Sequence, residues 1–268
     1  MGIPMKLKIA AFALAALAAS TSAFADTERL EIVGTGDGME ALNSLGTDFS
    51  SQNPDVKIVI PPSIGSGGGI AAVGSARAVL GRVARKLTDT EREAGIVYKP
   101  IAKLPSALFA HPSTNVKGLT AAQLVDIYEG RIANWKDVGG ADMRIRVVRR
   151  EDADSTFIVL RGSMPGWKSI QITDRSKMAT TTQEAIESVR EVPGAIGFGP
   201  YSRALEPGLN VLKIDGRHPT DEGYPSSVEL ALIYTDGTIT APARKFVDYA
   251  AGARGREVIA SVGGVPVR

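Results

Sequence analysis

The chain has 268 residues, with 31 lysines and arginines against 29 aspartates and glutamates, so its formal net charge is +2. This near balance argues against a nucleic-acid partner, because nucleic-acid binders usually carry a clear basic excess. The chain has no cysteine, which excludes disulfides and a lipid carried on an N-terminal cysteine. Its two histidines, His111 and His218, do not have metal-ligand spacing, so we expect no metal and no cofactor.

The first 25 residues have the three parts of a secretory signal peptide. Lys6 and Lys8 precede an apolar run over residues 9–19, and Ala23-Phe24-Ala25 forms a cleavage site. The run is too short to span a bilayer, which takes about 20 residues. Its removal leaves as many basic as acidic side chains. We therefore expect a soluble periplasmic protein without a lipid anchor.

The remaining residues alternate strand-like and helix-like segments, which predicts an α/β fold. Expected strands cover residues 30–33, 56–60, 145–148, 195–198 and 211–214, and residues 79–83 form a short apolar run. Expected helices cover residues 39–51, 70–76, 119–128, 157–162, 181–191, 242–250 and 256–262, with Thr120 as an N-cap and Thr181 with Glu184 as a capping box.

Two apolar segments are suited to cross between lobes. They are residues 96–110, which contain two prolines, and residues 230–234. We expect lobe one to combine residues 26–104 and 226–268, lobe two to cover residues 105–225, and a ligand cleft to lie between them.

Three loops share one design, covering residues 34–38, 65–69 and 150–156. Each follows a strand, is rich in Gly, Ser, Thr or Asp, and leads into a helix. The first turn of a helix has unpaired N–H groups and a partial positive charge, which together suit an anion. Glycine permits close approach to the backbone, and Arg150 can hold two oxygens at once. If the three loops converge, they form an anion site.

Catalytic motifs find little support in the sequence. Gly65-Ser66-Gly67 lacks the spacing of a nucleophile elbow, and no P-loop lysine follows either glycine-rich loop. Asp152 and Asp154 lack the glycine and distal glutamate of a calcium loop. We therefore expect a binding protein and not an enzyme.

Several motifs together resemble one family. They are Gly36-Asp37-Gly38-Met39, the glycine-rich run 65–69, the segment 80–87, the segment from Leu119 through Asn134-Trp135-Lys136-Asp137-Val138-Gly139-Gly140, residues 150–156, and the segment 193–198. With these motifs the chain resembles the phosphate-binding receptors of bacterial ABC phosphate importers, which have the type II periplasmic binding protein fold. The segment around Trp135 is the most specific of them.

The resemblance implies a phosphate ion held in the cleft at the helix N-termini. By position, its donors would be Gly38, Met39, Ser66, Arg150, Ser155 and Thr156, and Trp135 would be structural. It also implies hinge closure over the ligand and delivery by a monomer to an inner-membrane permease.

Two positions depart from the family pattern. An aspartate that accepts the proton of hydrogen phosphate is matched here by Arg85, and a serine of the third loop is replaced by Asp154. Our hypothesis is that Asp154 supplies the acceptor and that Arg85 balances its charge. The same changes are equally consistent with a different ligand or a degenerate site.

Three alternatives stay open at this stage. The chain could be a receptor for another small oxyanion, an exported hydrolase of phosphate esters, or a secreted sensor or adhesion protein that reuses the fold.

Overall fold

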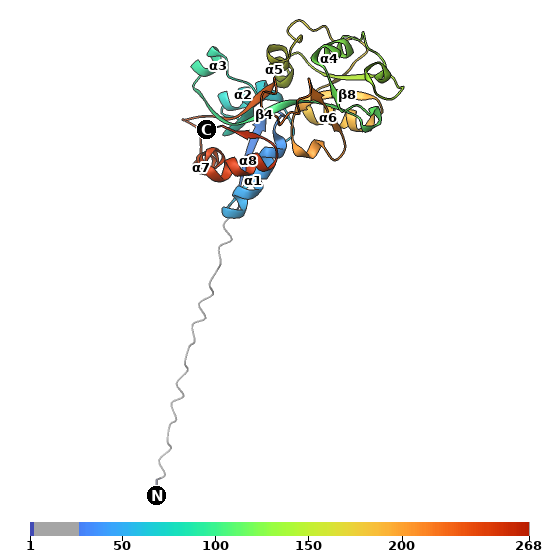
Figure 1. The fold of residues 1–268 in the computed structure, drawn as a ribbon. Helices are drawn as coiled ribbons and strands as arrows, with labels where there is room; N and C mark the ends of the chain where they lie inside the picture. Colours follow the sequence, from blue (N-terminus) through green and yellow to red (C-terminus); the bar gives the residue numbers. More distant parts are fainter. Residues whose placement is uncertain (3–26, 268) are drawn as a thin grey trace.

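The computed structural model describes residues 1–2 and 27–267. Apart from its first two residues, the expected signal peptide lies outside the described residues. The chain folds into two lobes joined by long strands, with the beginning and the end of the described fold in the same lobe (Figure 1). None of the helices described is both long and apolar enough to cross a bilayer.

Lobe one is built on the strands β1 (Glu28–Gly34), β2 (Val56–Val59), β3 (Leu80–Val83) and β11 (Ser227–Thr235). β1 is parallel to β2 and β3, whereas β11 is antiparallel to β3. Its helices are α1 (Met39–Gln52), α2 (Gly65–Gly74), α3 (Asp89–Glu93), α7 (Ala241–Ala251) and α8 (Ala253–Ser261).

The core of lobe one forms where amphipathic helices meet the sheet. In α1 the buried positions Leu42, Leu45 and Phe49 recur at helical spacing. The ring of Phe49 packs edge-on against Phe246 of α7, with their centroids 5.3 Å apart. This contact joins the start of the fold to its C-terminal segment.

Lobe two contains the strands β6 (Arg146–Arg150), β7 (Lys177–Ala179) and β8 (Ala195–Pro200), with helices α4 (Ala121–Tyr128), α5 (Ser155–Ser163) and α6 (Thr182–Glu191). Trp135 is fully buried there, and its Nε1 donates to the carbonyl of Gly194 at 2.8 Å. The structural role expected for Trp135 is therefore confirmed.

Short elements complete the described part of the chain: η1 (Pro112–Thr114), η2 (Trp135–Val138), η3 (Arg203–Leu205), β5 (Gly118–Leu119), β9 (Asn210–Val211), β10 (Lys213–Ile214) and β12 (Val265–Pro266).

The strand β4 (Ile96–Ala110) connects the two lobes, as residues 96–110 were expected to do. Its first part pairs with β11, and residues 106–110 pair with β8. Leu104 belongs to the core of lobe one and Leu108 to the core of lobe two. The expected α/β fold of two lobes is confirmed, and the lobe limits at 104/105 and 225/226 remain a prediction consistent with these cores.

Three sequence-based expectations need correction. The run 65–69 is not a loop before a helix, because Gly65 already begins α2. Residues 230–234 pair with β4 inside lobe one, so the chain returns to this lobe earlier, near Ser226, whose carbonyl accepts from the amide of Ser106. The capping box at Thr181 is half formed, because the Glu184 carboxylate accepts from the amide of Thr180.

Candidate functional site

A buried arginine fixes the first loop. Arg82 of β3 is fully buried, and its guanidinium donates to the carbonyls of Ile32, Thr35 and Pro61. Burial lowers the pKa of Arg82 to about 10. Since its three partners lie on β1, on the following loop and after β2, Arg82 holds the carboxyl ends of neighbouring strands together.

The glycine-rich start of α2 packs closely against that loop. A Cβ on Gly69 would lie 2.9 Å from the Cα of Gly34, which explains glycine at position 69. The N-cap residue of α2, Ile64, makes no side-chain hydrogen bond, and the amide of Gly65 donates to Oγ of Ser63 at 3.3 Å. The next amides of the first turn, those of Ser66 and Gly67, remain available to a ligand. The Oγ of Ser66 accepts from the amide of Ala84 at 3.1 Å.

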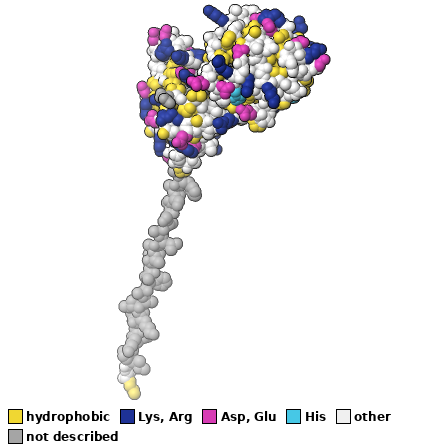
Figure 2. All heavy atoms as spheres, in the orientation of Figure 1, with side chains coloured by type: hydrophobic (Ala, Val, Ile, Leu, Met, Phe, Trp, Pro, Cys, Tyr) yellow, Lys and Arg dark blue, Asp and Glu magenta, His cyan; other side chains and the backbone are white. Residues whose placement is uncertain are grey.

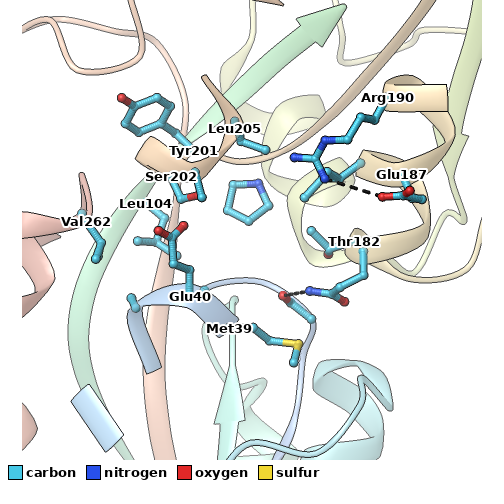
Figure 3. A pocket seen from close by; sticks show the side chains of 18 residues that line it. Met39, Glu40, Leu104, Thr182, Glu187, Arg190, Tyr201, Ser202, Leu205 and Val262 are labelled. Carbon is cyan, nitrogen blue, oxygen red and sulfur yellow. Dashed lines mark hydrogen bonds and ion pairs between the residues drawn. The ribbon is translucent and has the colours of Figure 1, made fainter. Parts of the chain in front are cut away.

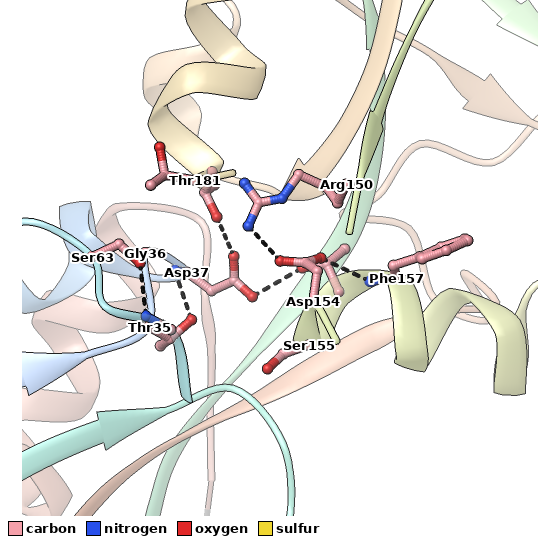
Figure 4. A network of polar contacts seen from close by, with 12 residues as sticks. Thr35, Gly36, Asp37, Ser63, Arg150, Asp154, Ser155, Phe157 and Thr181 are labelled. Atoms are coloured by element: carbon pink, nitrogen blue, oxygen red, sulfur yellow. Dashed lines mark hydrogen bonds and ion pairs between the residues drawn. The ribbon is translucent and has the colours of Figure 1, made fainter. Parts of the chain in front are cut away.

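In lobe two, the third loop places an arginine beside a carboxylate. Asp154 is the N-cap of α5 and accepts from the amide of Phe157 at 3.0 Å. Its other oxygen lies 2.6 Å from Nη2 of Arg150, and both side chains are more than 90% buried (Figure 4). The guanidinium of Arg150 retains two buried nitrogens, Nε and Nη1, for which residues 27–267 provide no partner.

The lobes contact each other directly through polar side chains. Asp37, almost fully buried, accepts from Thr182 at 2.6 Å and from Thr156 at 3.0 Å (Figure 4). Ser66 Oγ lies 2.9 Å from Ser155 Oγ. Burial raises the pKa of Asp37 to about 6, with the charge of Asp154 as a second cause. A carboxylate of lobe one thus bridges the first turns of two helices in lobe two.

A cavity of about 360 Å³ opens beside this contact. Its lining combines the β1–α1 loop, the first turn of α2, the β6–α5 loop and the residues before α6. Of the eight predicted site residues, it brings together Ser66, Arg150, Asp154 and Ser155. Thr156 lies next to them in α5 and is bonded to Asp37.

Three predicted site residues lie elsewhere. Gly38 and Met39 line a second cavity on the α6 side of Gly36. Arg85 makes two hydrogen bonds to the carboxylate of Glu91, at 2.8 and 2.9 Å, and does not line the 360 Å³ cavity. The expectation that Arg85 balances Asp154 is corrected, because Arg150 neutralises that carboxylate.

Sequence reasoning missed Asp37, Thr182 and Arg82. A carboxylate between two glycines, as in Gly36-Asp37-Gly38, is a signal that could have singled out Asp37. Arg82 stands in an otherwise apolar strand of buried residues, which is unusual for a charged side chain. Nothing in the sequence near Thr182 indicates that it bonds to Asp37, which lies 145 residues earlier in the chain.

The chain matches the PBP superfamily domain over residues 18–254. It belongs to this superfamily. Two curated members are similar to it: the phosphate-binding protein PstS of Bacillus subtilis, 29% identical and covering 75% of this chain and 68% of the relative, and PstS of Borreliella burgdorferi, 26% identical over 67% and 69%.

A solved structure from Clostridium perfringens is also similar. It is described as a candidate phosphate ABC transporter substrate-binding protein with bound phosphate. It is 28% identical, has a TM-score of 0.80, and covers 90% of this chain and 100% of its own. The two-lobed fold of this chain is therefore similar to that of a protein solved with bound phosphate.

Proposed function

We propose that this protein is a periplasmic receptor that captures inorganic phosphate for an ABC importer. The proposal rests on membership of the PBP superfamily, on the similarity to PstS proteins, and on the cavity between the lobes. Its role is binding and delivery rather than catalysis.

The single observation that carries the proposal is the environment of Arg150. Two of its buried N–H groups have no partner in the described chain, and a buried donor without a partner is energetically costly. Arg150 lines the same cavity as the first turn of α2, Ser66 and Ser155. An oxyanion placed there receives charge-assisted hydrogen bonds from the arginine and amide hydrogens from the helix.

Asp154 also belongs to the proposed site. Its carboxylate lines the cavity with each oxygen already in one hydrogen bond. Each carboxylate oxygen accepts more than one bond, so Asp154 retains capacity for a proton on the ligand. Hydrogen phosphate has such a proton and sulfate has none at neutral pH. Asp154 thereby favours phosphate, as the sequence hypothesis states, although Arg150 and not Arg85 balances its charge.

The remaining parts of the proposal concern the cell. A signal peptide over residues 1–25 delivers the protein to the periplasm, where it works as a monomer with an inner-membrane permease. On the face shown in Figure 2, basic and acidic side chains are interspersed over both lobes, and the surface is indented between them. This mixed surface suits a diffusing receptor and not a nucleic-acid partner.

Isothermal titration calorimetry of phosphate tests the proposal. Arg150→Gln should weaken binding by roughly tenfold to a hundredfold, because hydrogen bonds to a charged group contribute about 1.5–3 kcal/mol. Arg149→Gln is the matched control: Arg149 is the neighbouring residue of β6, its side chain points to the opposite face of the strand, and it does not line the cavity. Phosphate affinity in this control should stay within twofold of the wild type.

Sulfate provides the second arm of the experiment. The wild type should prefer phosphate, and Asp154→Asn should lose that preference. A wild type that binds sulfate but not phosphate would support a receptor for another oxyanion. Release of phosphate from p-nitrophenyl phosphate would instead support the hydrolase and contradict the proposal.

A further inference from the structure

A second cavity, of about 320 Å³, lies across the lobe contact from the proposed phosphate site. Gly36 lines both cavities. Between them, the side-chain amide of Gln183 donates to the carbonyl of Gly36 at 3.0 Å, and Thr182 donates to Asp37. The second cavity therefore has walls from both lobes and shares Gly36 with the proposed phosphate site.

The lining of this cavity is mainly apolar. Lobe one contributes Met39, Leu104 and Val262, and lobe two contributes Ile186 and Leu205 (Figure 3). A mainly apolar cavity with a few polar groups is typical of a site for a small organic ligand.

The charged side chains of the lining give the cavity a net negative charge. The lining contains three of them, Glu40, Glu187 and Arg190. Glu187 pairs with Arg190 at 3.5 Å, which leaves Glu40 as the unneutralised charge of the lining. Oxygen Oε2 of Glu40 is buried, and the described residues offer it no hydrogen-bond donor. In Figure 3 the Glu40 carboxylate points toward Ser202 of the opposite wall.

We propose that this cavity binds a small organic cation, a protonated amine carried on an apolar body. The ammonium group pairs with the Glu40 carboxylate, which carries the unneutralised charge of the lining. The apolar body lies against Met39, Ile186 and Leu205, where it removes apolar surface from water.

The position of the cavity also makes it an effector site. A ligand that touches both lobes stabilises the arrangement in which its two walls are close. The lobe contact at Asp37 belongs to that same arrangement, so the cation and the anion favour one conformation. By reciprocity, each ligand then tightens the binding of the other by the same factor. This coupling rests on the proposed phosphate function, whereas binding of the cation does not.

Benzylamine, which is protonated at neutral pH, is the probe for the binding step. Its calorimetric titration into the phosphate-free protein should saturate with one site per chain. Benzyl alcohol has the same shape without the charge, and benzoate has the opposite charge, so both should bind at least tenfold more weakly. Equal affinity for benzylamine and benzyl alcohol, or no saturable binding of benzylamine, would overturn the proposal.

Substitutions locate the site. Glu40→Gln should weaken benzylamine binding about tenfold, as expected for one charge-assisted hydrogen bond. Ile186→Trp should abolish binding by filling the cavity, which gives an independent test should Glu40→Gln fail to fold. Glu93→Gln, on the exposed face of α3, is the matched control and should bind as the wild type does. Unchanged affinity in both cavity variants would place benzylamine elsewhere and refute the assignment.

Phosphate titrations with and without saturating benzylamine test the coupling. The proposal expects tighter phosphate binding in the presence of the amine and the same factor in the reverse experiment. An unchanged phosphate affinity would refute the coupling. If the wild type bound no phosphate at all, the proposed function would fail, while the benzylamine titration would still decide the cation site.

Discussion

Replacing Asp37 with asparagine should change how stability depends on pH. Asp37 is buried, and its pKa is raised from 3.8 to about 6 mainly by that burial. The folded protein therefore holds this proton more tightly than the unfolded chain does. The stabilisation from the bound proton is complete below about pH 4 and is lost as the pH rises through about 6. Asparagine does not titrate, so the unfolding free energy of Asp37→Asn does not fall for this reason as the pH rises.

The size of the effect follows from the shift. The pKa of Asp37 differs by about 2 between the folded and unfolded states. At 1.36 kcal/mol for each pKa unit, this corresponds to about 3 kcal/mol of unfolding free energy. Between pH 4 and pH 7 the unfolding free energy of Asp37→Asn should therefore rise relative to the wild type by up to that amount. The amide keeps one acceptor and gains donors, so it can still bond to the hydroxyls of Thr156 and Thr182.

Urea unfolding of phosphate-free protein at pH 4, 5, 6 and 7 measures this difference. Asp55→Asn removes an exposed carboxylate and is the matched control, whose unfolding free energy should follow the wild type across the series. A constant difference between Asp37→Asn and the wild type at all four values would show that burial does not raise the Asp37 pKa, and the reasoning would be refuted.

Three substitutions test how the site is supported. Arg82→Met should destabilise the protein by about 3 kcal/mol or more in urea unfolding, since the buried carbonyls that Arg82 serves lose their donor. Gly69→Ala should cost about 1–3 kcal/mol because its Cβ would meet the Cα of Gly34, whereas Gly67→Ala, with open space at that position, should cost less than about 1 kcal/mol; thermal melting compares them. Trp135→Phe should lower the unfolding free energy by about 1–2 kcal/mol through a lost hydrogen bond and a small cavity, and near-UV circular dichroism would check that lobe two remains folded.

The parts of the fold that follow from local pattern could be predicted from the sequence. The apolar spacing in residues 39–51 gave α1 to within one residue, and the long extended segment at 96–110 is β4. Thr120 caps α4 with a complete capping box, because that signal lies within four residues. Such features depend on residues that are close together in the chain, so they can be predicted from a single sequence.

The parts that depend on distant partners could not be predicted. Arg85 was assigned to the site by position in a motif, but the carboxylate six residues later, Glu91, holds it away. Asp37 meets its hydroxyl partners on α5 and α6 only because the lobes approach each other. The glycine-rich run 65–69 is interpreted from the sequence as a loop, since glycine has a low helix propensity. In the structure it is the first part of α2, and Gly69 lies too close to Gly34 for a side chain.

A crystal structure of the protein grown with phosphate tests the central claim most directly. The account predicts one phosphate ion between the lobes, within hydrogen-bond distance of Nε or Nη1 of Arg150 and of the first amides of α2. Phosphate bound only at another surface, or a cavity at Arg150 that stays empty at saturating phosphate, would contradict it.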